Sequence, residues 1–198
     1  MFWQRKKQQA EAHIDKPATI RELGAVDISA LKPLIEQIPE GVWAMENAKK
    51  ENNFFCFHHT QHIVFRFIQG NRDHRHSYAT PLWQLWQARL LPVMKQAIRP
   101  YAYQQPIFPK VMLARLSPGG LIDPHVDGAG SNLHTHKIHI PIQTNDYVRF
   151  NIKHQAYMLK EGFAYEVNNI VKHSVENGGE MARIHLIFEL FEGGNAVA

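Results

Sequence analysis

The sequence predicts a mainly β domain, a sandwich or barrel with helices on its N-terminal side. After Pro109, short runs of alternating apolar residues recur between turns that contain glycine or proline, and this pattern is typical of antiparallel sandwiches and barrels. An amphipathic helix precedes these runs and is able to cover an outer face of the sheet. The chain has 198 residues, 44% of them apolar, which favours a single domain over residues 1–198 with a sizeable core.

Residues 1–50 are expected to form an N-terminal extension with one short helix. Apolar residues follow Asp27 at helical spacing, and Pro39 and Gly41 mark the end of that helix.

The β core is expected over residues 51–191. Its first strand is indicated by Ile63, Phe65 and Phe67, which alternate with other residues up to a Gly-Asn turn, and a charged loop follows over 71–78. The remaining strands are expected at 111–117, 137–144, 147–153, 156–160, 163–167, 170–175 and 181–191.

The clearest helix spans residues 81–98 and is expected to cover the core. Thr80 suits the N-cap and Pro81 the first helical position, while Pro92 is expected to bend or break the helix. Both tryptophans of this helix are assigned to core packing rather than to a substrate platform. Its apolar face recurs at three- and four-residue steps and comprises Leu82, Leu85, Trp86, Leu90, Val93, Met94 and Ala97.

The composition excludes several classes of protein. No apolar stretch approaches the roughly 18 residues that a membrane span needs, and the polar sequence after the basic start argues against a secretory signal. A single cysteine, Cys56, cannot form an intramolecular disulfide, so we expect a cytoplasmic protein. Its 13 histidines beside that one cysteine exclude a thiolate zinc site and leave a histidine and carboxylate site open.

The net charge of +4 says little about partners. Arg5, Lys6 and Lys7 form a basic tip, and without them 19 basic residues face 18 acidic ones. No aromatic-and-basic stripe or known binding motif supports nucleic acid as a partner. We expect a small-molecule or peptide substrate and no membrane partner, and the sequence leaves the oligomeric state open.

A candidate metal site follows a Pro-Gly-Gly turn in the β region. His125 and Asp127 form a His-x-Asp pair, whose side chains fall on the same side of an extended segment. His173, in a later strand, can supply a third ligand. Two histidines and one carboxylate make a facial triad that suits Fe(II) and leaves three positions for cosubstrate and oxygen.

Arg183 lies on the last strand, on the same face as His185 and Ile187. A guanidinium stays charged at neutral pH and can hold a carboxylate through two parallel hydrogen bonds. Beside an open iron site, such a group suits a dicarboxylate that chelates the metal at its other end.

These residues belong to an ordered set of motifs: Pro-Gly before His-x-Asp, a basic-x-His-Ile strand, a Glu-Gly turn, His-x-x-x-Asn, and Arg-x-His-Leu. In this order, over residues 110–190 and more weakly from 55, the sequence resembles the aspartyl/asparaginyl β-hydroxylase family, which is related to bacterial proline hydroxylases. The resemblance implies a double-stranded β-helix, a jelly-roll or cupin-like barrel. It also implies a dioxygenase that uses Fe(II), 2-oxoglutarate and molecular oxygen to hydroxylate an unactivated C–H bond.

The resemblance also implies roles for single residues. Arg183 would bind the distal carboxylate of 2-oxoglutarate, and His139 and Lys137 would contact the cosubstrate. Lys137 stands where the family often has arginine, and Ala114 where some relatives have serine. The iron ligands would be His125, Asp127 and His173.

The other histidines and two strand arginines are assigned structural or solvated roles outside the active site. His134 and His136 are expected to be solvated in a Gly- and Ser-rich loop over 128–135, which is itself a candidate lid. Three more histidines lack a further partner for a metal site, namely His58, His59 and His62. The arginines assigned to strand charges rather than to a substrate carboxylate are Arg66 and Arg115.

Two alternatives from other classes stay open. A cupin-like metal enzyme that does not use 2-oxoglutarate would have no need of Arg183. A non-catalytic binding module could use the basic N-terminus on a nucleic acid, with binding that is sensitive to salt. The substrate itself, whether a free amino acid, a peptidyl Asp or Asn, or a lipid-linked chain, lies beyond the sequence.

Overall fold

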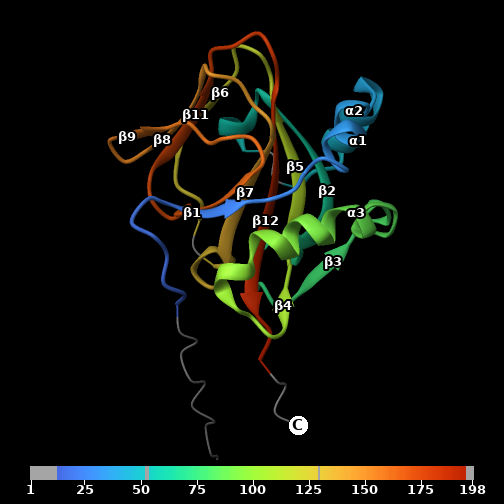
Figure 1. Ribbon diagram of the computed structural model, residues 1–198, viewed down its shortest axis with the longest axis vertical. Helices are drawn as coiled ribbons and strands as arrows, with labels where there is room; N and C mark the ends of the chain where they lie inside the picture. The colour runs from blue at the N-terminus through green and yellow to red at the C-terminus, as the bar shows by residue number, and fades with distance from the viewer. Residues whose placement is uncertain (1–12, 52–53, 129, 195–198) are drawn as a thin grey trace, which may run out of the picture.

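Two antiparallel sheets face each other in the computed structural model, which describes residues 13–51, 54–128 and 130–194 (Figure 1). The basic tip at residues 5–7 lies outside the described residues. The major sheet has the strand order β1-β10-β7-β12-β5-β2-β3, with β4 paired to β12, and the minor sheet has the order β6-β11-β8-β9. This architecture confirms the predicted mainly β, cupin-like fold with helices on its N-terminal side.

The elements have the following bounds. The strands of the major sheet are β1 (Ile20–Ala25), β2 (Thr60–Ile68), β3 (Ser77–Ala79), β4 (Pro106–Ile107), β5 (Val111–Leu116), β7 (His136–Gln143), β10 (Phe163–Val167) and β12 (Arg183–Glu192). Those of the minor sheet are β6 (Leu121–His125), β8 (Val148–Ile152), β9 (Gln155–Tyr157) and β11 (His173–Asn177). The helices are α1 (Lys32–Glu36), α2 (Glu40–Ala48) and α3 (Pro81–Ala97), and short 3₁₀ turns lie at Phe55–Phe57, Gln69–Asn71, Arg99–Tyr101 and Ser131–Leu133.

The central strand β12 separates the core from the cavity side of the major sheet. Ile184, Leu186 and Phe188 point to one face, where they pack with α3 and the N-terminal helices. Arg183 and Ile187 point to the other face and line a cavity between the sheets. This alternation is the period of two that the sequence predicts for a half-buried strand, and it is what places Arg183 inside the barrel.

The second apolar cluster lies between the two sheets. It joins Leu116 of the major sheet to Phe150, Ile152 and Val175 of the minor sheet. Phe150 and Val175 of this cluster also line the cavity between the sheets. The polar groups of the site described below therefore have apolar neighbours.

Residues 20–48 pack as part of the domain, with a strand and two helices, rather than as an extension with one helix. β1 pairs with β10 at the sheet edge, where Ile20 lies opposite Val167. Two helices follow, because Pro39 occupies the N-cap of α2 and Gly41 falls inside it instead of ending a single helix. Because β10 lies far along the chain from β1, the sequence near β1 gives no local signal of this pairing.

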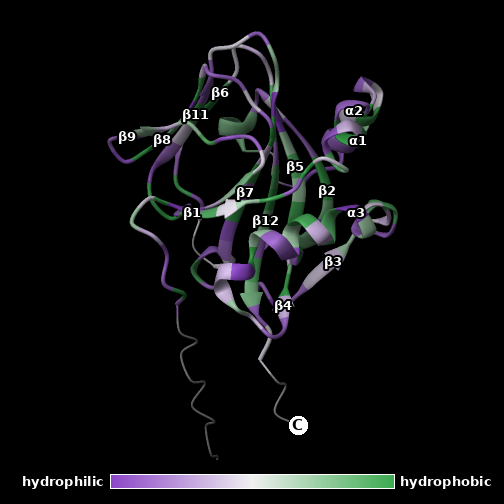
Figure 2. Cartoon of the chain, viewed as in Figure 1, coloured by the Kyte–Doolittle hydropathy of each residue, from purple (hydrophilic) through white to green (hydrophobic). Residues whose placement is uncertain are grey.

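The covering helix α3 forms as predicted but differs in three details. It continues through Pro92 without a break, although a proline removes its own N–H donor and its ring crowds the carbonyl four residues earlier. Thr80 holds the N-cap position, yet its hydroxyl donates to the Val64 carbonyl at 2.8 Å and ties the helix to β2. Leu85, which we placed on the apolar face, is 66% exposed, whereas Trp83 is buried. In Figure 2, hydrophilic (purple) and hydrophobic (green) segments alternate along α3, as expected for a helix with one exposed and one buried face.

The turn before β11 also differs from prediction. The strand expected from 170 begins at His173, because the Asn168 side chain accepts the Ile170 N–H at 3.2 Å and turns the chain.

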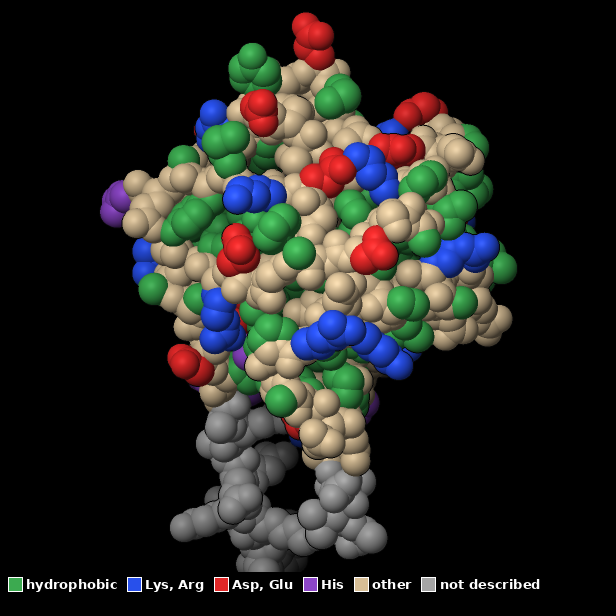
Figure 3. Space-filling model, in the orientation of Figure 1, with side chains coloured by type: hydrophobic (Ala, Val, Ile, Leu, Met, Phe, Trp, Pro, Cys, Tyr) green, Lys and Arg blue, Asp and Glu red, His purple; other side chains and the backbone are tan. Residues whose placement is uncertain are grey.

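No helix within the described ranges is long and apolar enough to cross a membrane. On the face shown in Figure 3, Lys and Arg side chains are interspersed with Asp and Glu.

Candidate active site

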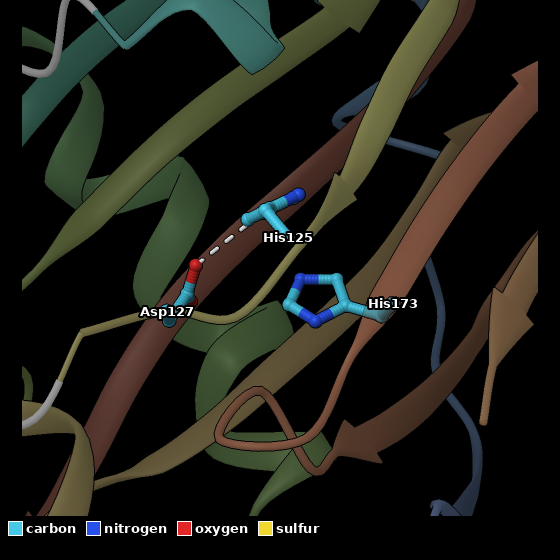
Figure 4. Close-up of side chains that lie close together, drawn as sticks. All are labelled: His125, Asp127 and His173. Carbon is cyan, nitrogen blue, oxygen red and sulfur yellow. Dashed lines mark ion pairs between the residues drawn. The ribbon is translucent and has the colours of Figure 1, made fainter.

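The structure brings His125, Asp127 and His173 together at the open end of the minor sheet (Figure 4). β6 ends at His125 and β11 begins at His173, and the two residues are direct partners across these strands. Asp127 lies two residues further along the chain. One potential ligand atom from each side chain lies within 4.8 Å of the other two, so strands distant in sequence converge as the motif spacing predicted.

Both histidines are oriented as metal ligands. The Nδ1 of His125 lies 2.7 Å from the Asp123 carbonyl, and the Nδ1 of His173 lies 2.9 Å from the Val171 carbonyl. A carbonyl can only accept, so each Nδ1 carries a proton and Nε2 is the nitrogen that remains to bind a metal. Such a backbone partner is the usual way in which a protein fixes the tautomer of a ligating histidine.

The third ligand is held as a carboxylate. One oxygen of Asp127, Oδ2, accepts hydrogen bonds from the Lys137 ammonium at 3.0 Å and the Asn169 amide at 2.9 Å. Its Oδ1 lies 3.5 Å from the Nε2 of His125. Burial opposes ionisation of Asp127, but Lys137, both histidines and Asn169 outweigh burial and hold its pKa well below the ordinary value.

Asn169 is the residue of this site that the sequence analysis missed. Its amide donates to Asp127 and, at 2.7 Å, to Asn132 Oδ1, while its own Oδ1 accepts from Lys16 Nζ at 3.0 Å. The Asp127 N–H in turn donates to the Asn169 carbonyl at 3.0 Å. An Asn-Asn pair just before the second ligand strand was the available signal.

The triad opens into a cavity of about 410 Å³ between the sheets, a size suited to a small molecule. Apolar side chains such as Phe57, Phe67 and Phe150 form much of its wall. Within it lie all six predicted site residues, which are His125, Asp127, Lys137, His139, His173 and Arg183.

Arg183 is a buried cation that has no carboxylate partner among the described residues. Its side chain is 1% exposed, one N–H₂ group donates to His185 Nδ1 at 2.6 Å, and its Nε has no partner within the described chain. Burial lowers the pKa of Arg183 to about 9, and no acidic group counters this effect. A buried guanidinium in that condition is stabilised only by an anion that enters the cavity.

The remaining two residues of the predicted cosubstrate set differ in charge. Burial, reinforced by Arg183 and Lys137, lowers the pKa of His139 well below its ordinary value, so this histidine is neutral. Lys137 is charged and lies between two carboxylates, 3.0 Å from Asp127 and 3.8 Å from Glu189. Its ammonium is therefore engaged with the metal ligand as well as facing the cavity.

Two imidazole Nε2 atoms and one ionised carboxylate fit Fe(II), because this donor set occupies one face of an octahedral ion. The Arg183 guanidinium in the same cavity, which has no acidic partner among the described residues, fits a dicarboxylate cosubstrate. Within the described residues, no other group of His, Cys, Asp and Glu side chains has the geometry of a metal site.

The structure changes the roles assigned to two histidines, His136 and His62. His136 is buried rather than solvated, since it begins β7 and its Nδ1 lies 2.6 Å from the carboxylate of the buried Glu166. His62 lines the cavity, and burial lowers its pKa to about 3. Arg115 pairs with Glu40 and Arg66 with Ser77, as expected for strand charges.

The 128–135 loop is tied down at several points. Ser131, Asn132 and Thr135 are buried. Asn132 donates to the Gly128 carbonyl at 2.7 Å, and the hydroxyl of Thr135 bonds to Glu189 at 3.0 Å. These contacts make the loop a packed wall of the site.

The sequence of residues 83–192 matches a family model described as aspartyl/asparaginyl beta-hydroxylase. No curated protein matches the chain. The fold is similar to an oxidoreductase of the 2OG-Fe(II) oxygenase family from Burkholderia pseudomallei, with 11% identity over 94% of this chain and 98% of that one and a TM-score of 0.52. It is also similar to a viral collagen prolyl hydroxylase from Paramecium bursaria Chlorella virus 1, with 9% identity over 88% and 97% of the two chains and a TM-score of 0.50. At these identities the likeness concerns the fold alone.

Proposed function

Because this chain belongs to the aspartyl/asparaginyl beta-hydroxylase family of 2-oxoglutarate- and Fe(II)-dependent oxygenases, we propose that it hydroxylates an unactivated C–H bond of an amino acid or of an Asp- or Asn-type peptide residue. The observation that carries the proposal is the pairing, in one cavity, of the His125, Asp127 and His173 triad with Arg183. A metal enzyme that binds no dicarboxylate has no use for a buried guanidinium without an acidic partner.

The side chains of this site have distinct tasks. His125, Asp127 and His173 would hold Fe(II), which when bound supplies the activation of oxygen that no protein side chain can provide. Arg183 binds the distal carboxylate of 2-oxoglutarate through its N–H groups. Lys137 and Asn169 keep Asp127 ionised and fix which of its oxygens faces the metal.

The cavity walls contribute by excluding water. Phe57 packs edge-on against His125, with ring centroids 5.2 Å apart, and Phe150 stacks on His173 at 5.9 Å. These rings restrict both ligands to one orientation. They also leave an apolar space in which a C–H bond can approach the metal without competition from solvent.

Release of succinate from 2-oxoglutarate, with and without Fe(II), tests the proposal. We expect H125A and D127A to abolish iron-dependent succinate release, because each removes one of three ligands. We expect R183K to raise the 2-oxoglutarate concentration needed for half-maximal rate by at least about tenfold, since lysine cannot form the paired hydrogen bonds.

Arg149 offers a matched control, because its guanidinium bonds to the Asp146 carbonyl at 2.6 Å and lies outside the cavity. R149K should leave the 2-oxoglutarate requirement unchanged. Turnover that is independent of 2-oxoglutarate, or equal in R183K and the original protein, would instead support the cupin-like alternative.

A further inference from the structure

Positions along the cavity face of β12 show where the parts of the site lie relative to one another. Arg183, Ile187 and Glu189 lie on this face, and the six residue steps from Arg183 to Glu189 span roughly 20 Å of strand. Neighbouring strands add residues at each level. Ile187 is paired with Met112 and His139, whereas Glu189 is paired with Lys137 and donates its backbone N–H to the Lys110 carbonyl at 2.9 Å.

The triad stands over the part of β12 between Ile187 and Glu189, away from Arg183. Asp127 contacts Lys137, which lies at the Glu189 level. Phe150 packs against both His139 and His173, with ring centroids 5.8 Å and 5.9 Å away, so the triad also adjoins the His139 level. Arg183 therefore lies on one side of the triad along the sheet. Lys110 lies at the Glu189 level, across β12 from Lys137.

The Lys110 end of the cavity is polar and preformed. The Lys110 ammonium is buried, 2.8 Å from Glu189 Oε1 and 2.8 Å from Asn71 Oδ1, and it lies over the Phe67 ring. An ammonium has three donors, so one is left after these two contacts. The side-chain oxygen of Asn71 accepts from Lys110, so the two N–H donors of the Asn71 amide point away from the ammonium. Both residues line the cavity.

The charges of the cavity do not balance. Lys110, Lys137 and Arg183 are opposed by Asp127 and Glu189, which leaves one positive charge in excess. A divalent metal and a doubly charged 2-oxoglutarate would cancel each other and leave the excess in place. Buried charge without a counterion is unfavourable, so the complete site favours a further anion.

We propose that Lys110 and Asn71 bind a carboxylate of the substrate, so that the substrate is a small carboxylic acid with its reacting carbon a few bonds from that carboxylate. This inference rests on the proposed function, because it assigns the Arg183 side of the triad to 2-oxoglutarate. The interval between the His139 and Lys110 levels is one two-residue step, roughly 7 Å, which fits a body of amino-acid size. Phe57 and Phe67 form the apolar wall beside it.

Binding to the full chain loaded with Zn(II) and saturated with 2-oxoglutarate tests the inference without turnover. The probes are the twenty L-amino acids and their primary carboxamides, screened by saturation-transfer NMR and followed by calorimetric Kd values. We expect at least one free acid to bind, and its carboxamide to bind at least about tenfold more weakly, because the amide carries no charge.

Variants assign this preference to Lys110. Lys110→Gln together with Glu189→Gln removes both charges of the buried pair and leaves neither one unpaired. We expect this double variant to weaken binding of the free acid at least about tenfold. Binding of 2-oxoglutarate should weaken less than binding of the acid, because Lys137 keeps Asp127 as its nearer partner. Glu189→Gln alone keeps the Lys110 charge and should retain the preference for the acid.

Equal binding of acid and carboxamide, or unchanged acid binding in the double variant, would overturn the assignment of Lys110. A panel in which no carboxylate binds while 2-oxoglutarate binds normally would overturn it as well. Loss of the proposed function has a different signature, which is failure of the metal-loaded protein to bind 2-oxoglutarate in a manner that depends on Arg183.

Discussion

Single side chains set the chemistry of this site through hydrogen bonds that fix protons. The carbonyls of Asp123 and Val171 hold the two ligand histidines in the tautomer that leaves Nε2 open. Lys137 and Asn169 hold one oxygen of Asp127 and leave the other to face His125. The ligands are therefore already arranged before a metal arrives, so binding need not reorganise them.

Asn169→Ala tests this arrangement at one residue. The substitution removes two donors and one acceptor near Asp127, so we expect the affinity for Fe(II) or Zn(II) to fall about 10- to 100-fold, as measured by competition with a chelator. Asn151→Ala, on the outer side of the minor sheet where the amide bonds to Glu176 at 3.2 Å, is the control. Equal metal affinity in the two variants would show that Asn169 has no part in ligand positioning.

At the scale of elements, α3 carries a local conflict that its packing overrides. Val93 and Met94 next to Pro92 are buried against the major sheet, and this burial keeps the helix continuous although proline disfavours it. The sequence rule for proline was correct in its physics. It lacked the tertiary contacts that outweigh it.

Pro92→Ala should stabilise the protein, because Pro92 is exposed and alanine restores a backbone donor to the helix. We expect the free energy of unfolding to rise by about 1 to 2 kcal/mol, since the gain of about 3 kcal/mol in the helix is partly offset by a more flexible unfolded chain. Urea denaturation measures the change, with the exposed Leu85→Ala as a control. A loss of stability would mean that the proline ring itself packs favourably.

At the scale of the whole molecule, several buried histidines couple the fold to pH. Burial lowers the pKa of His62 to about 3 and those of His139 and His185 well below their ordinary value. Below pH 6.5 the unfolded chain takes up protons on these rings that the folded chain rejects. Stability is therefore full above the unfolded pKa and falls as the pH falls from there.

We expect the metal-free protein to lose up to about 1.4 kcal/mol of unfolding free energy per pH unit for each such histidine between pH 6.5 and 4. His62→Gln should remove one histidine's share of this slope, whereas the exposed His154→Gln should not. Urea unfolding at several pH values provides the measurement, and an unaltered slope in His62→Gln would refute the role of His62.

The sequence was most informative where the signal is local. Period-two alternation located β2, β5, β7 and β12, and the spacing of His125, Asp127 and His173 located the triad. What it could not provide depends on contacts between distant segments. Lys110 meets Glu189 across 79 positions of chain and Asn169 meets Asp127 across 42. The Asn168-Asn169 pair marks the turn before His173, but nothing in the sequence around either contact identifies its distant partner.

The place of β12 in the major sheet bears on how the protein is made. β12 is the last strand in chain order, yet it lies between β7 and β5 near the middle of the sheet. While the ribosome is still translating the segment before Arg183, β7 and β5 have no common neighbour, and the edges that they later pair with β12 have no partner strand. The domain must therefore fold late, after most of its chain has emerged. A nascent chain that already displays His125, Asp127 and His173 still lacks the strand that closes the sheet behind them.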